Sequence, residues 1–193
     1  MEEIVQITGF FLGDGFWLDN RVAFSNTNED LIKHYANIIG QTGFKTRLYK
    51  RKKQGNRKDE FTLVAEKKMS NKIRRKLCNI NLSTKGKCKA FLKGIFDAEG
   101  TISFSSTRRG RQIKITNTNQ KLILLVKYCL IKLGIRHSIS LTKDKRPNRK
   151  DCFNVKTYGQ SSIKFIKNVR PHKLWSKDYL KGKIHPNYLY IFQ

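Results

Sequence analysis

Two short stretches of the chain carry the same pattern, and they lie almost half a chain apart. Residues 7–15 read ITGFFLGDG and residues 92–100 read LKGIFDAEG. Each is an apolar run with small residues four positions apart, closed by an acid, Asp14 or Glu99, and then by a glycine. The acids are 85 positions apart in a chain of 193 residues. A repeated element with one acid per copy is what a two-fold site in a single polypeptide requires.

The pattern predicts two helices that pack closely and end at the acids. Residues four positions apart share one helix face, and small ones there let two helix backbones approach each other. The small pairs are Gly9 with Gly13 and Gly94 with Ala98. Gly15 and Gly100 suit a left-handed residue that ends a helix. A carboxylate at a helix C-terminus interacts unfavourably with the helix dipole. The presence of two such acids is explained if divalent cations lie between them. The alternative is that they are solvated acids on unrelated turns.

The repeat extends well beyond these stretches. Residues 25–32 read SNTNEDLI and residues 116–123 read TNTNQKLI, while NRKD occurs at 56–59 and again at 148–151. The similarity therefore runs from about residue 4 to 65 and from about 89 to 157. Periodicity predicts helices at 3–13, 28–41, 67–78, 88–98, 119–133 and 160–168, with strands at 16–18, 21–25, 45–51, 60–65, 101–106, 111–116, 136–142 and 152–157.

These elements predict an α+β fold with two pseudo-symmetric αββαββα half-domains, each with an antiparallel sheet. We place the N-terminal half at 1–82, the C-terminal half at 83–170, the linker between them at about 79–88, and a C-terminal tail at 171–193. The tail contains Trp175, Tyr179 and Tyr188, which could pack on the body of the protein; the alternative is that the tail is mobile.

The charge balance predicts a polyanionic partner. The chain has 41 Lys and Arg against 14 Asp and Glu, a net charge of +27. Nucleic acid is the first expectation and an anionic membrane surface the second. The sequence contains no run of about 20 apolar residues, which a membrane span would need, and no apolar signal segment follows Met1. We therefore expect an intracellular protein that is not secreted. The four cysteines have no C-x-x-C spacing, which disfavours zinc.

Strand alternation predicts which side chains face a nucleic acid. Polar and basic residues fall on one face of the predicted strands in both copies, and the hairpin turns at 50–58 and 143–150 are densely basic. Such a face can read base edges while the turns contact phosphates. The predicted DNA-binding residues are Arg21, Ser25, Lys45, Arg47, Tyr49, Arg51, Arg57, Thr62, Arg108, Arg109, Gln112, Lys114, Thr116, Arg136, Ser138, Ser140, Thr142, Asn154 and Lys156. The alternative is that these are ordinary solvated sheet faces and loops.

The paired stretches resemble the signatures of LAGLIDADG homing endonucleases. The stretch 92–100 matches closely, whereas 7–15 departs with Thr8, Phe10 and Phe11, and with Leu12 at the motif's inner acid. The resemblance covers about residues 4–170. Two motifs in one chain imply the single-chain, monomeric branch of that family.

The resemblance implies a fold, a cofactor and an activity. Two saddle-shaped sheets would grip double-stranded DNA, and the motif helices would form the interface between the halves. Asp14 and Glu99 would bind Mg²⁺, which Mn²⁺ could replace, with the backbone carbonyls of Gly13 and Ala98. The protein would be an intron-encoded endonuclease that cuts both strands of a long, pseudo-palindromic target and leaves short 3′ overhangs.

The resemblance also implies supporting residues. Asn26 and Asn117 match the polar position that orients the attacking water. A basic residue near each scissile phosphate is expected, and the candidates are Lys85 and Lys87 in the linker and Lys173 in the tail. Two alternatives remain open: an RNA maturase that binds its own intron RNA, and a catalytically silent DNA-binding regulator.

Overall fold

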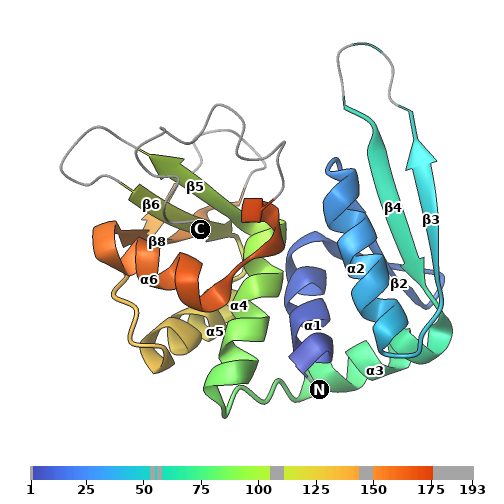
Figure 1. The fold of residues 1–193 in the computed structure, drawn as a ribbon, viewed down its shortest axis with the longest axis horizontal. Helices are drawn as coiled ribbons and strands as arrows, with labels where there is room; N and C mark the ends of the chain where they lie inside the picture. The colour runs from blue at the N-terminus through green and yellow to red at the C-terminus, as the bar shows by residue number, and fades with distance from the viewer. Residues whose placement is uncertain (1, 53–54, 56–57, 105–110, 144–149, 176–193) are drawn as a thin grey trace.

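The computed structural model describes residues 2–52, 55, 58–104, 111–143 and 150–175, and these form two similar halves (Figure 1). The first half contains α1 (Glu2–Asp14), β1 (Gly15–Leu18), β2 (Arg21–Asn26), α2 (Glu29–Gln41), β3 (Thr46–Arg51), β4 (Glu60–Ala65) and α3 (Lys67–Cys78). The second contains α4 (Lys85–Glu99), β5 (Gly100–Phe104), β6 (Arg111–Asn117), α5 (Gln120–Lys132), β7 (Ser138–Thr142), β8 (Cys152–Tyr158) and α6 (Gly159–Val169), followed by the 3-10 helix η1 (His172–Trp175). The predicted α+β class and αββαββα order are confirmed.

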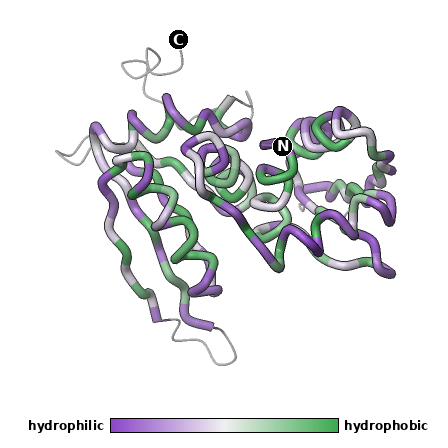
Figure 2. The backbone as a smooth tube through the Cα atoms, turned by 90° about the horizontal axis from the view of Figure 1, so that it is seen from below, coloured by the Kyte–Doolittle hydropathy of each residue, from purple (hydrophilic) through white to green (hydrophobic). Residues whose placement is uncertain are grey.

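Each half has one four-stranded antiparallel sheet. The strand order is β1-β2-β4-β3 in the first sheet and β5-β6-β8-β7 in the second. Alternate side chains point to opposite faces, so Phe24 and Leu63 enter the first core while Ser25 and Thr62 lie on the outer face. Helices cover the inner face of each sheet, and hydrophobic and hydrophilic residues alternate along both halves (Figure 2). Within the part of the chain that the structure describes, none of the helices combines the length and the apolar sequence that a membrane span requires.

Helices α1 and α4 lie side by side in the middle of the molecule (Figure 1). A Cβ on Gly9 would lie 2.5 Å from the Phe91 carbonyl oxygen, so the glycine is what permits the close approach. The predicted small residues are thus at this interface. The helices also share cores, because Val5 of α1 packs in the second-half cluster and Ala98 of α4 in the first-half cluster.

The prediction that Gly15 and Gly100 are left-handed is wrong. Gly100 has φ −76° and ψ 146°, and Gly15 is not among the described glycines with positive φ. Both glycines begin a strand directly after a helix. A Cβ would lie 2.7 Å from the Phe11 Cα at Gly15 and 2.5 Å from the Phe96 carbonyl oxygen at Gly100. These glycines are therefore required by the tight helix-to-strand junction.

Some predicted boundaries differ from the observed ones. Helix α4 begins at Lys85 rather than 88, because the Thr84 Oγ accepts the backbone N–H of Lys87 at 3.2 Å and caps the helix. The connection between halves is therefore 79–84, and Lys85 and Lys87 lie in a helix. Strand β7 begins at Ser138, which leaves Arg136 before the strand. Residues 105–106 of a predicted strand, the predicted contacts Arg57, Arg108 and Arg109, and tail residues 176–193 lie outside the described residues.

Candidate metal and nucleic-acid site

The two acids lie at the adjacent C-terminal ends of the central helices. Asp14 is the last residue of α1 and Glu99 the last of α4, and a Cβ on Gly13 would lie 2.9 Å from the Glu99 Cγ. Both carboxylates are half-buried. Burial raises the pKa of Asp14, and burial followed by repulsion from Asp14 raises the pKa of Glu99. The halves therefore hold two partly desolvated carboxylates close enough to repel each other.

Each acid is held by an asparagine at the end of a strand. The Asn26 Nδ2 donates to the Asp14 Oδ2 at 2.6 Å, and the Asn117 Nδ2 donates to the Glu99 Oε1 at 2.8 Å. Each bond uses one carboxylate oxygen, so the other can face a metal ion. Each asparagine therefore positions a carboxylate directly. The second N–H of each amide is what could orient a water, and that role stays a prediction.

The repeated N-T-N sequence accounts for this geometry. The Asn26 Oδ1 accepts the backbone N–H of Asn28 at 2.9 Å, which fixes the amide so that its N–H groups point toward Asp14. Asn28 then caps α2 by accepting the Leu31 N–H at 3.1 Å. Asn119 and Asn117 repeat the same bonds in the second half. One tripeptide thus begins a helix and orients an acid.

Lys173 is the predicted basic residue that the fold brings to the acids. Its Nζ donates to the Gly100 carbonyl at 3.0 Å and to the Ala98 carbonyl at 3.3 Å. Its charge opposes the burial effect and lowers the pKa of both acids. Lys85 and Lys87, by contrast, lie in the first turn of α4, about 20 Å along the helix from Glu99 at 1.5 Å per residue. The prediction that these two lysines assist the acids is therefore wrong.

Asp97 is a residue of this region that the sequence analysis did not select. It is fully buried, and its two oxygens accept the Tyr35 hydroxyl at 3.0 Å and the backbone N–H of Lys173 at 2.8 Å. Burial raises its pKa to about 7, against the opposing effect of these hydrogen bonds. The sequence did contain a signal, because an acid stands inside an apolar helix run where the other copy has Leu12.

The segment that carries Lys173 also docks on the first half. The His172 ring stacks on the His34 ring of α2, with centroids 3.8 Å apart and an interplanar angle of 4°. Burial, followed by the charges of His172 and Lys93, lowers the pKa of His34 to about 3. Burial also lowers the pKa of His172, so both stacked imidazoles are neutral at neutral pH. Helix η1 thus contacts both halves next to the C-terminal end of α4 (Figure 1).

The donor atoms around the acids suit a hard divalent cation. Among the described residues, no three His, Cys, Asp or Glu side chains cluster as a metal site. The available ligands are instead carboxylate and carbonyl oxygens, which Mg²⁺ accepts together with several waters. The predicted carbonyl ligand at Ala98 already accepts Lys173, so it has one remaining lone pair to offer.

The outer face of the first sheet combines basic and apolar residues. Antiparallel pairing aligns Arg47 with Val64 and Val64 with Ala23 in one row across the strands. Tyr49, Thr62 and Ser25 form the next row, in which the Ser25 and Thr62 hydroxyls lie 2.7 Å apart. The parity prediction missed Phe16 and Leu18 of β1, which are exposed at 39% and 42% and add apolar contact area.

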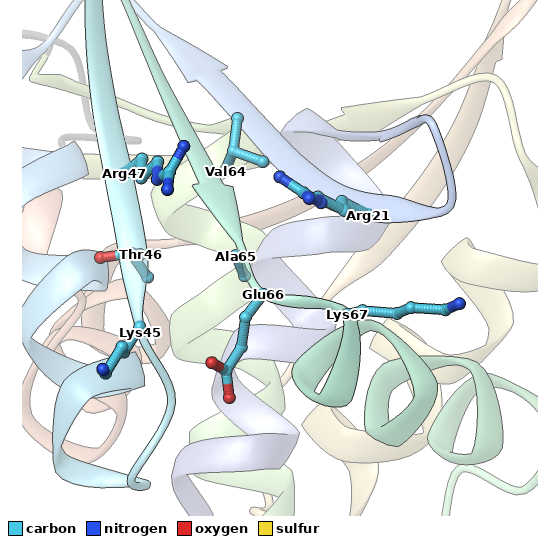
Figure 3. Close-up of a pocket in the computed structure, with 8 residues that line it drawn as sticks. All are labelled: Arg21, Lys45, Thr46, Arg47, Val64, Ala65, Glu66 and Lys67. Carbon is cyan, nitrogen blue, oxygen red and sulfur yellow. The ribbon is translucent and has the colours of Figure 1, made fainter.

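A basic pocket of about 300 Å³ opens at one end of this sheet (Figure 3). Arg21 and Arg47 point toward each other across Val64, while Glu66 points away from them. Lys45 and Lys67 also line the pocket. Two converging guanidinium groups are suited to bind a phosphate or a guanine edge.

The outer face of the second sheet is polar throughout its rows. One row aligns Ser138, Lys156, Lys114 and Thr101, of which Thr101 was not predicted. The next row contains Ser140, Asn154 and Thr116, and the row after it pairs Thr142 with Cys152. On the opposite side of the first row, Gln112 is aligned with Ser103 and Tyr158, which were not predicted.

Asn154 is the exception on this face. It is 6% exposed; its Oδ1 accepts the Thr116 hydroxyl at 2.8 Å and its Nδ2 donates to Thr142 at 2.9 Å. The amide is buried and bonded within the sheet, so the structure gives Asn154 a role in holding Thr116 and Thr142, and its contact with DNA stays a prediction.

Comparison with known proteins identifies a recurring domain. A model of the LAGLIDADG-like domain matches residues 2–78 and 87–169. No curated protein sequence matches the chain. A structure of mesophilic variants of the homing endonuclease I-DmoI has a TM-score of 0.64 and 25% identity, covering 87% of this chain and 94% of that one.

Two further structures are similar. I-DmoI in complex with DNA and Mn has a TM-score of 0.63 and 25% identity, covering 87% of this chain and 96% of that one. Full-length DUF199/WhiA from Thermatoga maritima has a TM-score of 0.63 at 15% identity, covering 99% of this chain and 64% of that one. The second similarity concerns the fold alone.

Proposed function

Because the chain belongs to the LAGLIDADG-like domain family, we propose that it is an intron-encoded endonuclease that cuts double-stranded DNA at one long, pseudo-palindromic site. The observation that carries this proposal is the pair of acids, Asp14 and Glu99, each held by an asparagine where the two halves meet. A protein that only binds DNA has no need for two mutually repelling, half-buried carboxylates, since their burial costs stability.

A divalent cation explains why these carboxylates are tolerated. Mg²⁺, with Mn²⁺ as a substitute, would be held by Asp14, Glu99 and the Gly13 and Ala98 carbonyls. It would supply an activated water and stabilise the leaving 3′ oxygen. The similar I-DmoI structures hold DNA with Mn or with Ca, which supports a divalent cation here.

The protein's own groups set the geometry of the reaction. Asn26 and Asn117 each fix one oxygen of an acid and leave the other oxygen available for a metal ion. The Lys173 ammonium adds a positive charge beside Glu99, where a phosphate would carry extra negative charge during attack. With one acid from each half, each strand would be cut once, which leaves short 3′ overhangs.

The outer sheet faces would bind the DNA on both sides of the cut. Arg21, Arg47 and the lysines of β6 and β8 supply the positive charge that phosphates need, and Gln112 and Tyr49 can reach base edges. A net charge of +27 supports an affinity dominated by phosphate contacts. We propose that the protein acts as a monomer within the cell, wherever its host DNA lies.

A cleavage assay tests the proposal. A plasmid that carries the intron-free insertion site is incubated with the protein and Mg²⁺, or with a chelator. We expect linear product only with the metal, and no double-strand product from Asp14→Asn or Glu99→Gln. Both variants should still bind the site in a gel-shift assay with Ca²⁺.

Asp19→Asn is the matched control, because it removes an acid from an exposed turn of the same half. It should cut like the wild type. Tight binding without cleavage under all conditions would overturn the nuclease proposal in favour of a regulator. Preferential binding to the intron transcript would favour a maturase.

A further inference from the structure

We propose that Asp97, assisted by Tyr35, is the positioning residue that holds Lys173 at the active site. This inference rests on the proposed nuclease function, and it assigns a role to a buried acid outside the pair that would bind metal. It explains how Lys173, which lies in the short 3-10 helix η1 beyond α6, reaches the acids.

The first step is the anchor at the backbone of Lys173. The Asp97 Oδ1 accepts the Lys173 backbone N–H at 2.8 Å, and its Oδ2 accepts the Tyr35 hydroxyl at 3.0 Å. Asp97 and Tyr35 are both fully buried, so the carboxylate that accepts the two bonds is shielded from bulk water. Asp97 therefore joins α4, α2 and η1 at a single carboxylate.

The second step is the direction that this anchor gives the side chain. With its backbone fixed to Asp97, Lys173 places Nζ on the carbonyls of Ala98 and Gly100, on either side of Glu99. A lysine side chain has a flexible four-carbon stem, so its ammonium stays at a defined place only when the backbone that carries it is fixed. Release of η1 would leave that charge free to move into solvent.

The third step is the asymmetry between the two motifs. Position 97 corresponds to Leu12 in the first copy, and Leu12 packs against the hydrophobic core instead of binding a backbone amide. The anchor therefore exists on one motif helix only. The structure assigns the delivered lysine to the Glu99 end of the site.

Non-additivity of substitutions distinguishes positioning from a general loss of stability. We would measure single-turnover cleavage for Lys173→Met, Asp97→Ala, Asp97→Asn and the double variant Asp97→Ala/Lys173→Met. We expect about a 100-fold loss for Lys173→Met, the size typical for an electrostatic catalytic group. Asp97→Ala should lose a similar factor in cleavage rate. The double variant should cleave at most about threefold more slowly than Lys173→Met alone.

Asparagine provides the conservative rescue. Its carbonyl oxygen can accept the Lys173 N–H and its amide can donate to the Tyr35 oxygen, so Asp97→Asn should recover activity to within about tenfold of the wild type. DNA affinity in Ca²⁺ should change less than threefold in all variants. Multiplied losses in the double variant, about 10⁴-fold, would overturn the inference because Asp97 would then act independently of Lys173.

Hydrogen exchange tests the anchor without any DNA. The Lys173 amide should lose at least 10-fold of its protection in Asp97→Ala and keep it in Asp97→Asn, while the amides of α3 serve as an internal control. Should Asp97→Ala not fold, Tyr35→Phe removes only the hydroxyl and should lower the same protection. Unchanged exchange would overturn the inference. A wild type that cuts no DNA would instead refute the proposed function and leave this measurement valid.

Discussion

Replacing Gly94 by alanine tests the close packing of the two motif helices. An added Cβ would lie 2.7 Å from the Phe10 backbone nitrogen and closer still to the Gln6 carbonyl oxygen. Ordinary contact begins at 3.4 Å, so the added Cβ and the Gln6 carbonyl oxygen would have to move apart by about 1.4 Å. The atoms in the way are backbone, which cannot rotate aside as a side chain can.

The expected cost follows from these contacts. Overpacking a core costs about 1–3 kcal/mol, and a backbone obstruction falls at the upper end of that range. The better helix propensity of alanine returns about 1 kcal/mol, which leaves a net loss of about 2 kcal/mol. For a chain of this size, the melting temperature should fall by about 4–8 °C.

Gly40 in α2 provides the matched control. It is an exposed helical glycine with no atom within 4 Å of an added Cβ. Gly40→Ala should therefore leave the protein as stable as the wild type or raise its stability by about 0.5 kcal/mol. Urea denaturation and thermal melting measure both variants. A Gly94→Ala protein with wild-type stability would refute the packing argument.

Three further predictions concern binding and stability. Affinity for DNA should fall at least about 10³-fold between 50 and 200 mM salt, and a flat response in titrations would argue against phosphate contacts. Asn154→Ala should cost about 1–3 kcal/mol in urea denaturation, whereas Gln112→Ala should relax preference at one base pair with little change in stability. The folded-state pKa of His34 is about 3 against an ordinary 6.5, so the unfolded chain takes up a proton first and His34 lowers stability as the pH falls from 6.5 to 3. Because the ring is half-buried, we expect the free energy of unfolding to fall by roughly half of the limiting 1.4 kcal/mol per pH unit. Denaturation at pH 7 and at pH 5 should show that His34→Gln loses less stability than the wild type by this amount per pH unit. The same pH dependence in both proteins would refute this.

The sequence predicted the elements well because both copies carry local signals. Asn28 caps α2 as expected, and the strand Glu60–Ala65 and the helix Lys67–Cys78 have their predicted bounds. These features depend on neighbours within one turn or one strand. The acids at the helix ends were predicted for the same reason, since two similar motifs each place one residue there.

The features that the sequence did not predict have a different origin, because they depend on contacts between distant residues. Parity places Asn154 on the outer face correctly, yet only the pairing with β6 and β7 shows that its amide is bonded to Thr116 and Thr142. Lys173 and Asp97 are 76 positions apart, and no local pattern predicts their hydrogen bond. Gly15 has the residue type of a helix cap, but the following strand sets its conformation.

The shared packing of the central helices has a consequence for synthesis on the ribosome. Val5 of α1 belongs to the hydrophobic core of the second half, which is complete only when α4 and the second sheet are present. The first half therefore emerges from the exit tunnel with an apolar strip that nothing yet covers. That strip remains exposed to chaperones, or to the same strip on another nascent chain, until α4 (Lys85–Glu99) has also left the tunnel and can dock.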